Sequence, residues 1–595
     1  MPFRIRSMRN RRGRREDECT RRLDTGTAAP HARAAATRQV VRVLSVCAVF
    51  LVSGCSDGGG SGGGAGGTSL TSLEQSSRLL AQATLGVDRA EIERVEALGF
   101  EVWLAEQLAL PGSSHLDETN RLIAAYGDPT EPATRESPVF RQLAWWNRVM
   151  SSPDLLRQRV ALALSEIFVV SERMDVLFIS PGCVASYYDT LVDHAFGPFE
   201  DLLLAVTLHP AMGHYLSHLN NDRSDALVGR FPDENYAREV MQLFSIGLFE
   251  LAPNGAVSTD SAGRPIPTYG NAEITEFAKI FTGLGVAGSI GGFGDPFGNC
   301  EAPMVMYESH HEPGPKSLLR GFVIPDGQTG MQDIRDAIGH LADHPNVGPF
   351  IGRRLIQRLV TSNPSPAYLE RVARVFADDG TGTRGNLGAV VRAILLDPEA
   401  REDPGDVRGG RLREPFLRFV ALMRAFRASS SSGEFLINGA AIGFLVDQTP
   451  LASPSVFNFF QPDFAPNGPV ADAGLVAPEF QITTDASVTW MANIITALSL
   501  EEASVTFDTA FFRPGSLDQA DAQIRLDLGE ELAHAGDIDA LLDHLDLKLT
   551  YGTLSSRTRD AIRTFLATPG LDDPNLRSRL AMHLILMSPD YAVAR

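Results

Sequence analysis

Cysteine is scarce in this sequence, which holds 5 cysteines in 595 residues, and no two of them form a Cys-x-x-Cys pair. A zinc site built from cysteines is therefore unsupported, because such a site needs closely spaced thiolates. The sequence also lacks glycine-rich phosphate-binding loops, the protein-kinase motifs and the His-Glu-x-x-His zinc motif. ATP, nicotinamide and zincin chemistry are thus unsupported, and the sequence names no cofactor and no metal.

Positive charge is in short supply, with 53 Lys and Arg against 73 Asp and Glu and a formal net charge of -20. Many of the arginines stand in the first 54 residues, so the rest of the chain is more acidic than the total indicates. Affinity for nucleic acid comes largely from Lys and Arg that neutralise phosphates. We therefore expect no nucleic-acid partner.

The apolar stretch Val43–Val52 is too short for a membrane-spanning helix, which needs about 20 residues. It follows an arginine-rich segment and leads into Val52-Ser53-Gly54-Cys55, which resembles a lipobox. We predict a lipoprotein signal peptide within residues 1–54, lipidation at Cys55 and export to the cell envelope. The residue after Cys55 is Ser56 rather than an Asp, which favours the outer membrane over the inner one. A secreted or merely tethered protein is the alternative to a lipoprotein.

The segment after Cys55 is rich in glycine and serine, with GGGSGGGAGG at Gly58–Gly67. We interpret residues 55–73 as the lipidated cysteine and a flexible tether, and residues 74–595 as one helical body. Cleavage before Cys55 leaves Cys183 and Cys300 as the other cysteines. In an oxidising compartment these two could form a disulfide, and two separately buried thiols are the alternative.

Apolar residues three and four apart recur along most of the chain, a spacing typical of amphipathic helices. Pro, Gly, Ser or Asp bounds most of these segments, and alternating strand patterns are few and short. We expect an all-α, or mainly α-helical, fold with one large multi-helix body and long irregular loops. The helical segments are residues 76–85, 89–108, 138–150, 154–170, 333–341, 348–361, 367–377, 387–396, 414–425, 487–500 and 557–587.

Three irregular segments interrupt these helices, at residues 251–269, 285–315 and 449–478. Ordered loops of this length in a helical body are uncommon unless they are functional or disordered. Their aromatic residues indicate that parts of them pack. The run Phe457-Asn458-Phe459-Phe460 is predicted to pack as a core plug rather than to stack on a ligand.

Seven segments, in order along the chain, carry a resemblance to one family: SSRLLAQATLG (76–86), LRQRVALALSEIFVVSE (156–172), ENYAREVMQLFSIGL (234–248), YGNAEITEFAKIFTGLG (269–285), HHEPGPKSLLRG (310–321), HPNVGPFIGRRLIQRLVTSNPSP (344–366), and SPSVFNFFQPDF with LVAPEFQI (453–482). They resemble the DUF1800 (domain of unknown function 1800) family of large exported bacterial proteins, over roughly residues 76–589. The resemblance implies export but supplies no established activity. The family's His-Asp-x-Gly-x-Lys pattern has Glu312 in the Asp position here.

A helix is predicted over Pro232–Leu248, with Pro232 suited to its first turn. At 100° per residue, Asn235, Glu239 and Gln242 form a polar stripe beside its apolar face. Glu234 and Arg238 lie opposite and are expected to form a solvated i,i+4 ion pair.

Glu239 is expected to be half buried and therefore to need a partner, since an unpaired buried carboxylate is costly. One interpretation is that it bridges a neighbouring helix through Arg157 or Arg159. The other is that it acts as a general base or a metal ligand.

The densest cluster of titratable groups is His310-His311-Glu312, followed by Gly314 and Lys316. Imidazole ligates metals or shuttles protons near neutral pH, and adjacent residues of an extended segment point to opposite sides, so at most one histidine is expected to be a ligand. A loop histidine on the surface is the plainer interpretation. Lys316 could bind an anionic group or pair with the acidic surface.

These residues make up the predicted site: Glu239, His311 and Lys316 are the candidate catalytic residues, and Asn235, Arg238 and His310 the candidate binding residues. Two histidines before proline, His209 and His344, are instead expected to act as helix caps. The oxygen-rich loop from Asn220 to Asp225 is expected to be an ordinary loop, since it lacks the Gly and Glu of a calcium-binding EF-hand.

The sequence leaves two functions open. The first is an accessory lipoprotein whose helical body binds an envelope protein or an extracellular polymer, with the membrane reached through the N-terminal lipid only. The second is an envelope hydrolase or metal-dependent enzyme in which Glu239, His311 and Lys316 meet in a cleft. Convergence of these side chains in a pocket would favour the second function.

Overall fold

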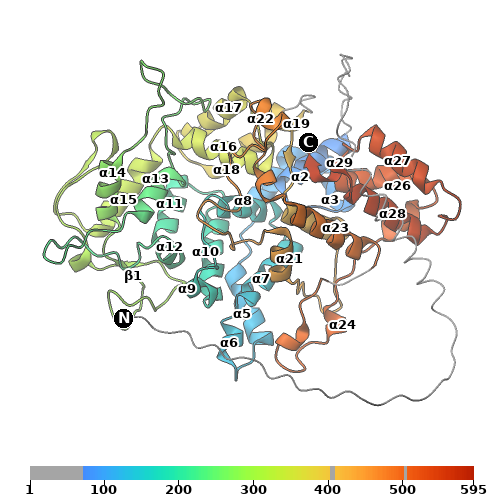
Figure 1. Ribbon diagram of the computed structural model, residues 1–595, viewed down its shortest axis with the longest axis horizontal. Coiled ribbons are helices and arrows are strands. Elements are labelled where there is room, and N and C mark those ends of the chain that lie inside the picture. The colour runs from blue at the N-terminus through green and yellow to red at the C-terminus, as the bar shows by residue number, and fades with distance from the viewer. Residues whose placement is uncertain (1–71, 403–408, 502–504) are drawn as a thin grey trace, which may run out of the picture. The chain divides into compact units, whose positions relative to one another are not determined.

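The elements of this protein are almost all helices, joined by long loops and by three short strand pairs (Figure 1). The structure is a computed structural model that describes residues 72–402, 409–501 and 505–595. Cys55, the predicted signal peptide and the predicted tether up to residue 71 therefore lie outside the described residues, whereas Ser72 and Leu73, assigned to the tether from the sequence, belong to the first described helix. The described helices belong to one unit, and the prediction of a mainly α-helical single body is confirmed.

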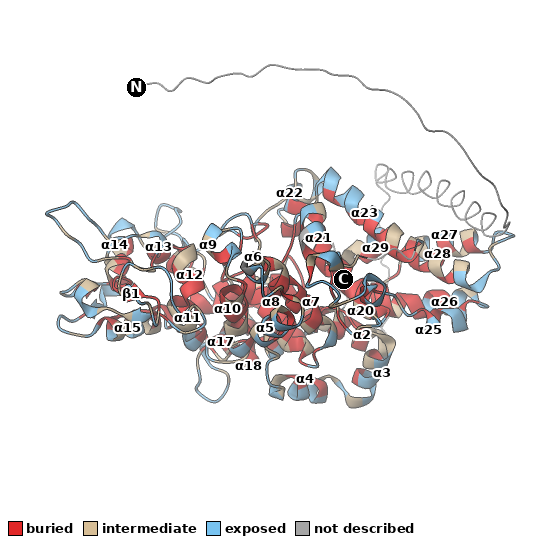
Figure 2. Ribbon diagram, turned by 90° about the horizontal axis from the view of Figure 1, so that it is seen from below, coloured by how far each residue is buried: buried red, intermediate tan, exposed pale blue. Residues whose placement is uncertain are grey.

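The central helices are those that bury the most apolar surface. Figure 2 shows buried residues gathered along α7, α8 and α10. Trp145 and Trp146 of α7 pack against Phe416 and Phe419 of α20, with ring centroids 5.0 to 5.4 Å apart. The helices of this region are α2 (Ser72–Ala83), α3 (Arg89–Leu98), α4 (Phe100–Ala109), α5 (His115–Tyr126), α6 (Pro132–Arg135), α7 (Pro138–Ser151), α8 (Leu155–Ser165), α9 (Asp175–Phe178), α10 (Pro181–Asp193) and α20 (Pro415–Ala425).

A second group of helices carries two of the three long loops predicted from the sequence, those at residues 251–269 and 285–315. It consists of α11 (Phe199–Leu208), α12 (Pro210–Tyr215), α13 (Asn235–Gln242), α14 (Asn271–Ile280) and α15 (Gly330–Ala342). Two antiparallel pairs tie the loops between α14 and α15: β1 (Leu284–Gly285) with β2 (Val305–Met306), and β3 (Lys316–Ser317) with β4 (Val323–Ile324). Short 3-10 turns lie at Glu308–His310 and Leu319–Gly321.

A third group begins with α16, which packs beside α8 and α17. It contains α16 (Val347–Leu359), α17 (Pro366–Ala377), α18 (Leu387–Leu396), α19 (Pro398–Arg401), α21 (Gly439–Val446) and α22 (Pro469–Asp472), with a 3-10 helix at Pro478–Ile482. Strand β5 (Arg411–Leu412) pairs with β6 (Val593–Ala594) and so brings the end of the chain back to α20.

The C-terminal helices pack on α23 (Asp485–Ser499) through α28. They are α25 (Gly529–His534), α26 (Ile538–Leu545), α27 (Ser556–Leu566), α28 (Pro574–Leu586) and α29 (Pro589–Ala592), with a π-helical turn at Asp546–Thr550. The preceding α24 (Gln519–Ala522) and the 3-10 turn at Thr509–Phe511 lie instead against α5 and α7, where Ala522 and Phe511 pack with Leu122 and Phe140. None of the helices in residues 72–402, 409–501 and 505–595 combines the length and the apolarity that crossing a membrane requires.

Three predicted helices differ from the structure. The segment 89–108 forms two helices because Gly99 lies at φ 82°, a left-handed conformation that ends α3 and begins α4. The segment 557–587 is likewise divided into α27 and α28. The helix predicted over Pro232–Leu248 is only Asn235–Gln242, and Gly247, at φ 73°, turns the chain after it.

Candidate functional site

The predicted catalytic residues His311 and Lys316 meet on the carboxylate of Asp333 in α15. His311 Nε2 lies 3.0 Å from Asp333 Oδ2, and Lys316 Nζ donates to the same oxygen at 2.6 Å. All three side chains are buried. Burial opposes ionisation of Asp333, but hydrogen bonds from His311, Lys316 and Gln328 outweigh it and hold its pKa below the usual value.

The polar atoms of this triad are taken up by the protein itself. His311 Nδ1 lies 3.0 Å from the carbonyl oxygen of Thr282, and Lys316 Nζ also donates to the carbonyl oxygen of Gly314. Gln328 Nε2 donates to Asp333 Oδ1 at 3.0 Å. Because these buried hydrogen bonds join the loops at residues 282–316 to Asp333, the arrangement acts as a cross-link between those loops and α15.

His310 points away from this triad, as expected for the neighbour of His311 in the chain. Its ring stacks on Phe293 with centroids 3.8 Å apart, and its Nδ1 lies 3.0 Å from Asp222 Oδ1. Arg230 also pairs with Asp222, at 2.8 Å. The Asn220–Asp225 loop is thus held by protein contacts to Asp222.

Glu239 does not join His311 and Lys316. Within the described ranges no hydrogen bond or ion pair connects it to either residue, and its Oε2 has no protein partner. The predicted bridge to Arg157 or Arg159 is wrong: these guanidinium groups donate instead to backbone carbonyls, Arg157 to those of Val192 and Leu110, and Arg159 to that of Arg358. Burial raises the pKa of Glu239, although nearby Arg238 opposes the rise.

The remaining predicted residues on α13 have surface roles. Asn235 is exposed at the start of the helix. Arg238 forms the expected i,i+4 ion pair with Glu234, at 3.6 Å. An exposed pair of this kind contributes well under 1 kcal/mol.

His209 acts as the predicted helix cap, whereas His344 lies in the turn before α16, whose N-cap is Asn346. His209 is the N-cap of α12, and its Nδ1 accepts a hydrogen bond from the backbone N–H of Ala211 at 3.1 Å. His344 Nδ1 accepts from the N–H of Asn346 in the same way. Burial lowers the pKa of His209 to about 3, so the ring is neutral and its Nε2–H donates to Ser186, which leaves Ser186 without a base.

A polar cavity that was not predicted from the sequence lies between α8, α16 and the 456–479 segment. We call it the Arg354 cavity. Its volume is about 60 Å³. Polar and apolar side chains alternate around it: Glu166, Ile167, Leu243, Arg354, Gln357, Arg358, Val456, Phe457, Asn458, Phe460, Gln461, Pro462, Pro478 and Glu479. Most of these residues come from the segments that carry the family resemblance.

Helix periodicity explains how α16 reaches this cavity. Arg354, Gln357 and Arg358, three and four residues apart, lie on one face of the helix. Arg354 is stacked over Phe350 at 3.4 Å, and Arg358 over Phe460 at 4.3 Å. Gln357 Nε2 donates to the carbonyl oxygens of Ser362 and Pro462 and so ties the helix to the 456–464 loop.

A buried ionic network supports the wall of the cavity. Arg358 Nη1 lies 3.3 Å from Glu166 Oε2, and Arg411 Nη1 lies 3.7 Å from Glu414 Oε1. Gln448 donates to both Glu166 and Glu414. Burial and the neighbouring Glu414 carboxylate raise the pKa of Glu166 well above its usual value, whereas Arg358 and the hydrogen bond with Glu166 outweigh burial and hold the pKa of Glu414 below its usual value.

Apart from the Arg358–Glu166 ion pair, three cavity side chains keep buried polar atoms that no other described protein group engages. Asn458 Nδ2, Gln357 Oε1 and Glu479 Oε2 are buried and have no hydrogen-bond partner in the described part of the chain. Arg354 donates to the carbonyl oxygen of Phe350 at 3.2 Å, and no described carboxylate lies within ion-pair distance of its guanidinium group. Native proteins rarely leave buried polar groups unpaired, so each of them indicates a place for a ligand group or water.

Burial raises the pKa of Glu479 to about 7, with the Glu414 carboxylate adding to the rise and Arg411 opposing it. Burial and the neighbouring Arg353 and Arg358 lower the pKa of Arg354 to about 9. Strongly shifted groups that share a cavity are typical of functional sites. No sequence motif signals them, because Glu166, Arg354, Asn458 and Glu479 are far apart in the chain.

A larger groove of about 810 Å³ lies between α3, α4, α7 and the end of α20. Its charged side chains are already paired: Arg94 with Glu91 and Glu106, and Arg427 with Asp527 and Glu530. Arg424 donates to the carbonyl oxygens of Gly86 and Val149. The groove thus offers space but few free polar groups, and the smaller cavity is the better candidate site.

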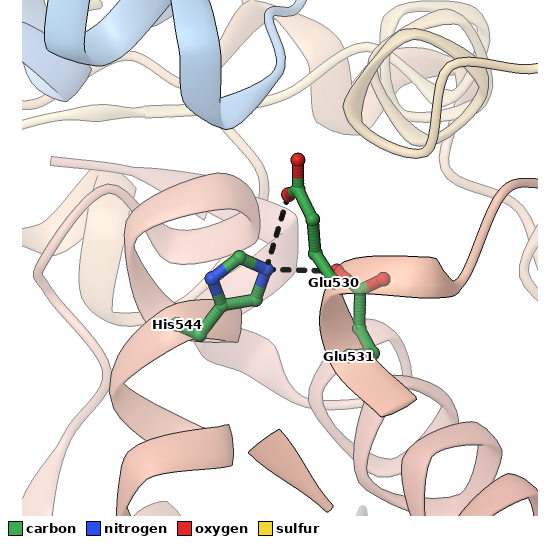
Figure 3. A group of neighbouring side chains, drawn as sticks. All are labelled: Glu530, Glu531 and His544. Atoms are coloured by element: carbon green, nitrogen blue, oxygen red, sulfur yellow. Dashed lines mark hydrogen bonds and ion pairs between the residues drawn. The ribbon is translucent and has the colours of Figure 1, made fainter. Parts of the chain in front are cut away.

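One group of side chains has the spacing of a metal site. Figure 3 shows His544 between Glu530 and Glu531, with His544 Nε2 3.5 Å from Glu530 Oε2 and 3.0 Å from Glu531 Oε1. However, Lys548 Nζ lies 2.5 Å from Glu531 Oε1 and 3.5 Å from Glu530 Oε2. Its ammonium already supplies the positive charge that a metal ion would bring, so these residues form an ion-pair network.

Cys183 of α10 is bonded to Cys300, so the structure contains the disulfide that the sequence leaves open. The bond joins residues 117 positions apart and fixes the 285–305 loop against α10.

Comparison with known proteins gives a family but no activity. No curated protein and no solved structure matches the chain. The family model described as "Protein of unknown function (DUF1800)" matches residues 78–593, which include both the His311 triad and the Arg354 cavity. The chain therefore belongs to the DUF1800 family.

Proposed function

We propose that this protein is an exported lipoprotein, anchored through Cys55 and favouring the outer membrane, whose helical body binds a small polar group of an envelope ligand in the Arg354 cavity. The observation that carries the binding role is the set of buried polar atoms in that cavity that lack protein partners. Preformed concave sites with a few convergent polar groups are the usual form of ligand sites.

Two features support export. The apolar stretch before Val52-Ser53-Gly54-Cys55 has the order of a lipoprotein signal peptide. The Cys183–Cys300 disulfide is of a kind that persists in oxidising compartments and is rare in the cytosol.

Binding is favoured over hydrolysis because the three predicted catalytic residues do not meet in one site. His311 and Lys316 are engaged with Asp333, and Glu239 contacts neither. Binding needs only the cavity and its free polar atoms, whereas hydrolysis needs a nucleophile and a base that face a substrate.

The anchor is tested by labelling cells with radioactive palmitate. The wild type should incorporate label and the Cys55→Ala variant should not. Cys47→Ala, which changes a cysteine inside the apolar stretch, is the matched control and should stay labelled. Label retained by the Cys55→Ala variant would rule out this anchor.

The cavity is tested by titration calorimetry of the detergent-solubilised full-length protein with propionate, propionamide and propylammonium. These three probes share a size and differ in charge. At least one should bind at a single site, and the Asn458→Gly variant should weaken it about tenfold or more. Glycine is chosen because Asn458 lies at φ 66°, which glycine adopts without strain. Failure of all three probes would overturn the binding function.

A further inference from the structure

The side chains around the Arg354 cavity indicate which chemical group of a ligand it binds. This inference rests on the proposed binding function and goes beyond it. We propose that the cavity takes a carboxylate at the end of its ligand, with the Arg354 guanidinium and the Asn458 amide as donors. Gln357 and Glu479 then accept hydrogen bonds from a hydroxyl or amino group next to that carboxylate.

The size of the cavity limits what enters it. A volume of about 60 Å³ corresponds to about two liquid waters, at about 30 Å³ each. A carboxylate with one substituent fits such a space, whereas a sugar ring does not. The group that enters is therefore the end of a ligand whose remaining part stays outside.

The charges around the cavity favour an anion. Arg354 and its neighbours Arg353, Arg358 and Asp463 lie on one side of the cavity, and the network behind its wall adds Arg159 and Arg411 with Glu166, Glu414 and Glu479. At formal charges, five guanidinium groups face four carboxyl groups, so this region carries one surplus positive charge although the whole chain carries -20. One negative charge balances this surplus, which favours a singly charged carboxylate over doubly charged phosphate.

The free donors and acceptors have the arrangement that such a group needs. Arg354 is the cavity guanidinium without a carboxylate partner among the described residues, whereas Arg358 is paired with Glu166. Asn458 Nδ2 adds an unpaired buried donor, and its side chain is 6% exposed. The unpaired oxygens of Gln357 and Glu479 cannot bind a carboxylate, because both are acceptors, but they suit an adjacent N–H or O–H.

The apolar wall sets the rest of the specificity. Ile167, Leu243 and Phe460 line the same cavity and exclude water from the ion pair between ligand and Arg354. Charge-assisted hydrogen bonds are stronger in such surroundings than in water.

The test uses the full-length protein in detergent and the same calorimetry. Propionate should bind at least tenfold more tightly than propionamide, propylammonium or inorganic phosphate. Arg354→Gln should weaken propionate binding tenfold or more. The matched control is Arg353→Gln, which removes the same charge from the exposed neighbour on α16 and should change the affinity less than twofold.

Two further probes identify where the carboxylate comes from. N-acetylglycine represents a peptide end and glucuronate a sugar acid; tighter binding of either than of propionate supports the carboxylate class and names its source.

The outcomes separate this inference from the function on which it rests. Binding of propionamide, propylammonium or phosphate that equals or exceeds that of propionate would overturn the carboxylate and leave the binding site in place. Equal losses in Arg354→Gln and Arg353→Gln would also overturn it, because the effect would then be one of net charge. Absence of binding by every probe would overturn both.

Discussion

The carboxylate of Asp333 decides the role of two residues that the sequence had marked as catalytic. His311 and Lys316 stand out in the sequence because they are close together, but Asp333 belongs to a different segment and carries no motif. Once all three are buried, each charge depends on the others, because an unpaired buried charge is costly. The sequence could thus identify two members of the triad but not its structural role.

Removal of the Asp333 charge should destabilise the fold. The Asp333→Asn change leaves the buried ammonium of Lys316 without its counter-ion, which costs about 3–5 kcal/mol when a buried pair is broken. We expect a lower urea midpoint by circular dichroism. Asp336→Asn, one turn further along α15 and less buried, is the control and should cost less than about 1 kcal/mol. Equal midpoints for the two variants would contradict the cross-link.

Glu479 should make stability depend on pH. Its pKa in the folded protein is about 7, above its usual value of 4.5. The folded state therefore holds the proton more tightly, and the resulting stabilisation is complete below pH 4.5 and is lost as the pH rises through 7. Glu479→Gln stays neutral, so its stability relative to wild type should rise by up to about 3 kcal/mol across this range.

This trend is measured by urea unfolding between pH 4.5 and pH 8. The groups that face Glu479 are Arg411, Glu414 and Arg358, which both proteins keep. The exposed Glu136→Gln variant, which removes a carboxylate from the surface, should follow wild type. Parallel curves for wild type and Glu479→Gln would show that the carboxyl group ionises normally.

At the scale of elements, glycines with positive φ redirect the chain where periodicity predicted a continuous helix. Gly99 ends α3, whereas α13 already ends at Gln242 and Gly247 turns the chain after it. Their surroundings differ. A side chain at Gly247 would lie 2.5 Å from Phe350, the ring beneath Arg354, whereas nothing lies within 4 Å at Gly99.

These two sites offer a matched pair of alanine substitutions. Gly99→Ala should lower the free energy of unfolding by about 1–2 kcal/mol through backbone strain alone. Gly247→Ala should cost a further 1–3 kcal/mol or so, because the methyl group overpacks against Phe350. Thermal unfolding measures both, and equal losses would show that Phe350 moves aside without cost.

At the scale of the whole molecule, the Cys183–Cys300 disulfide links two segments that the helices alone do not join. Their separation of 117 residues makes the loop long, and closing such a loop reduces the entropy of the unfolded chain. The sequence raised this pairing as one of two alternatives, since it contained no information on the distance between the thiols.

Loss of this disulfide should therefore lower stability. Cys300→Ser is expected to lower the free energy of unfolding by about 3–5 kcal/mol, as expected for a disulfide that closes a loop of roughly a hundred residues. Treatment of the wild type with dithiothreitol should lower the thermal midpoint to that of the variant, and the variant should not respond. A wild type insensitive to reductant under unfolding conditions would contradict the bond.

The sequence alone determined the helical class, the capping role of His209 and the Glu234–Arg238 pair, because periodicity, caps and i,i+4 pairs depend on residues within a few positions. It also carried the segments by which the family is identified. Only the tertiary structure decided that Asp333 joins His311 to Lys316, and that Glu166, Arg354, Asn458 and Glu479 surround one cavity. The physical reason is that a buried charge pairs with whichever group the packed chain places beside it. The distance between two side chains in the fold is not set by their separation along the sequence.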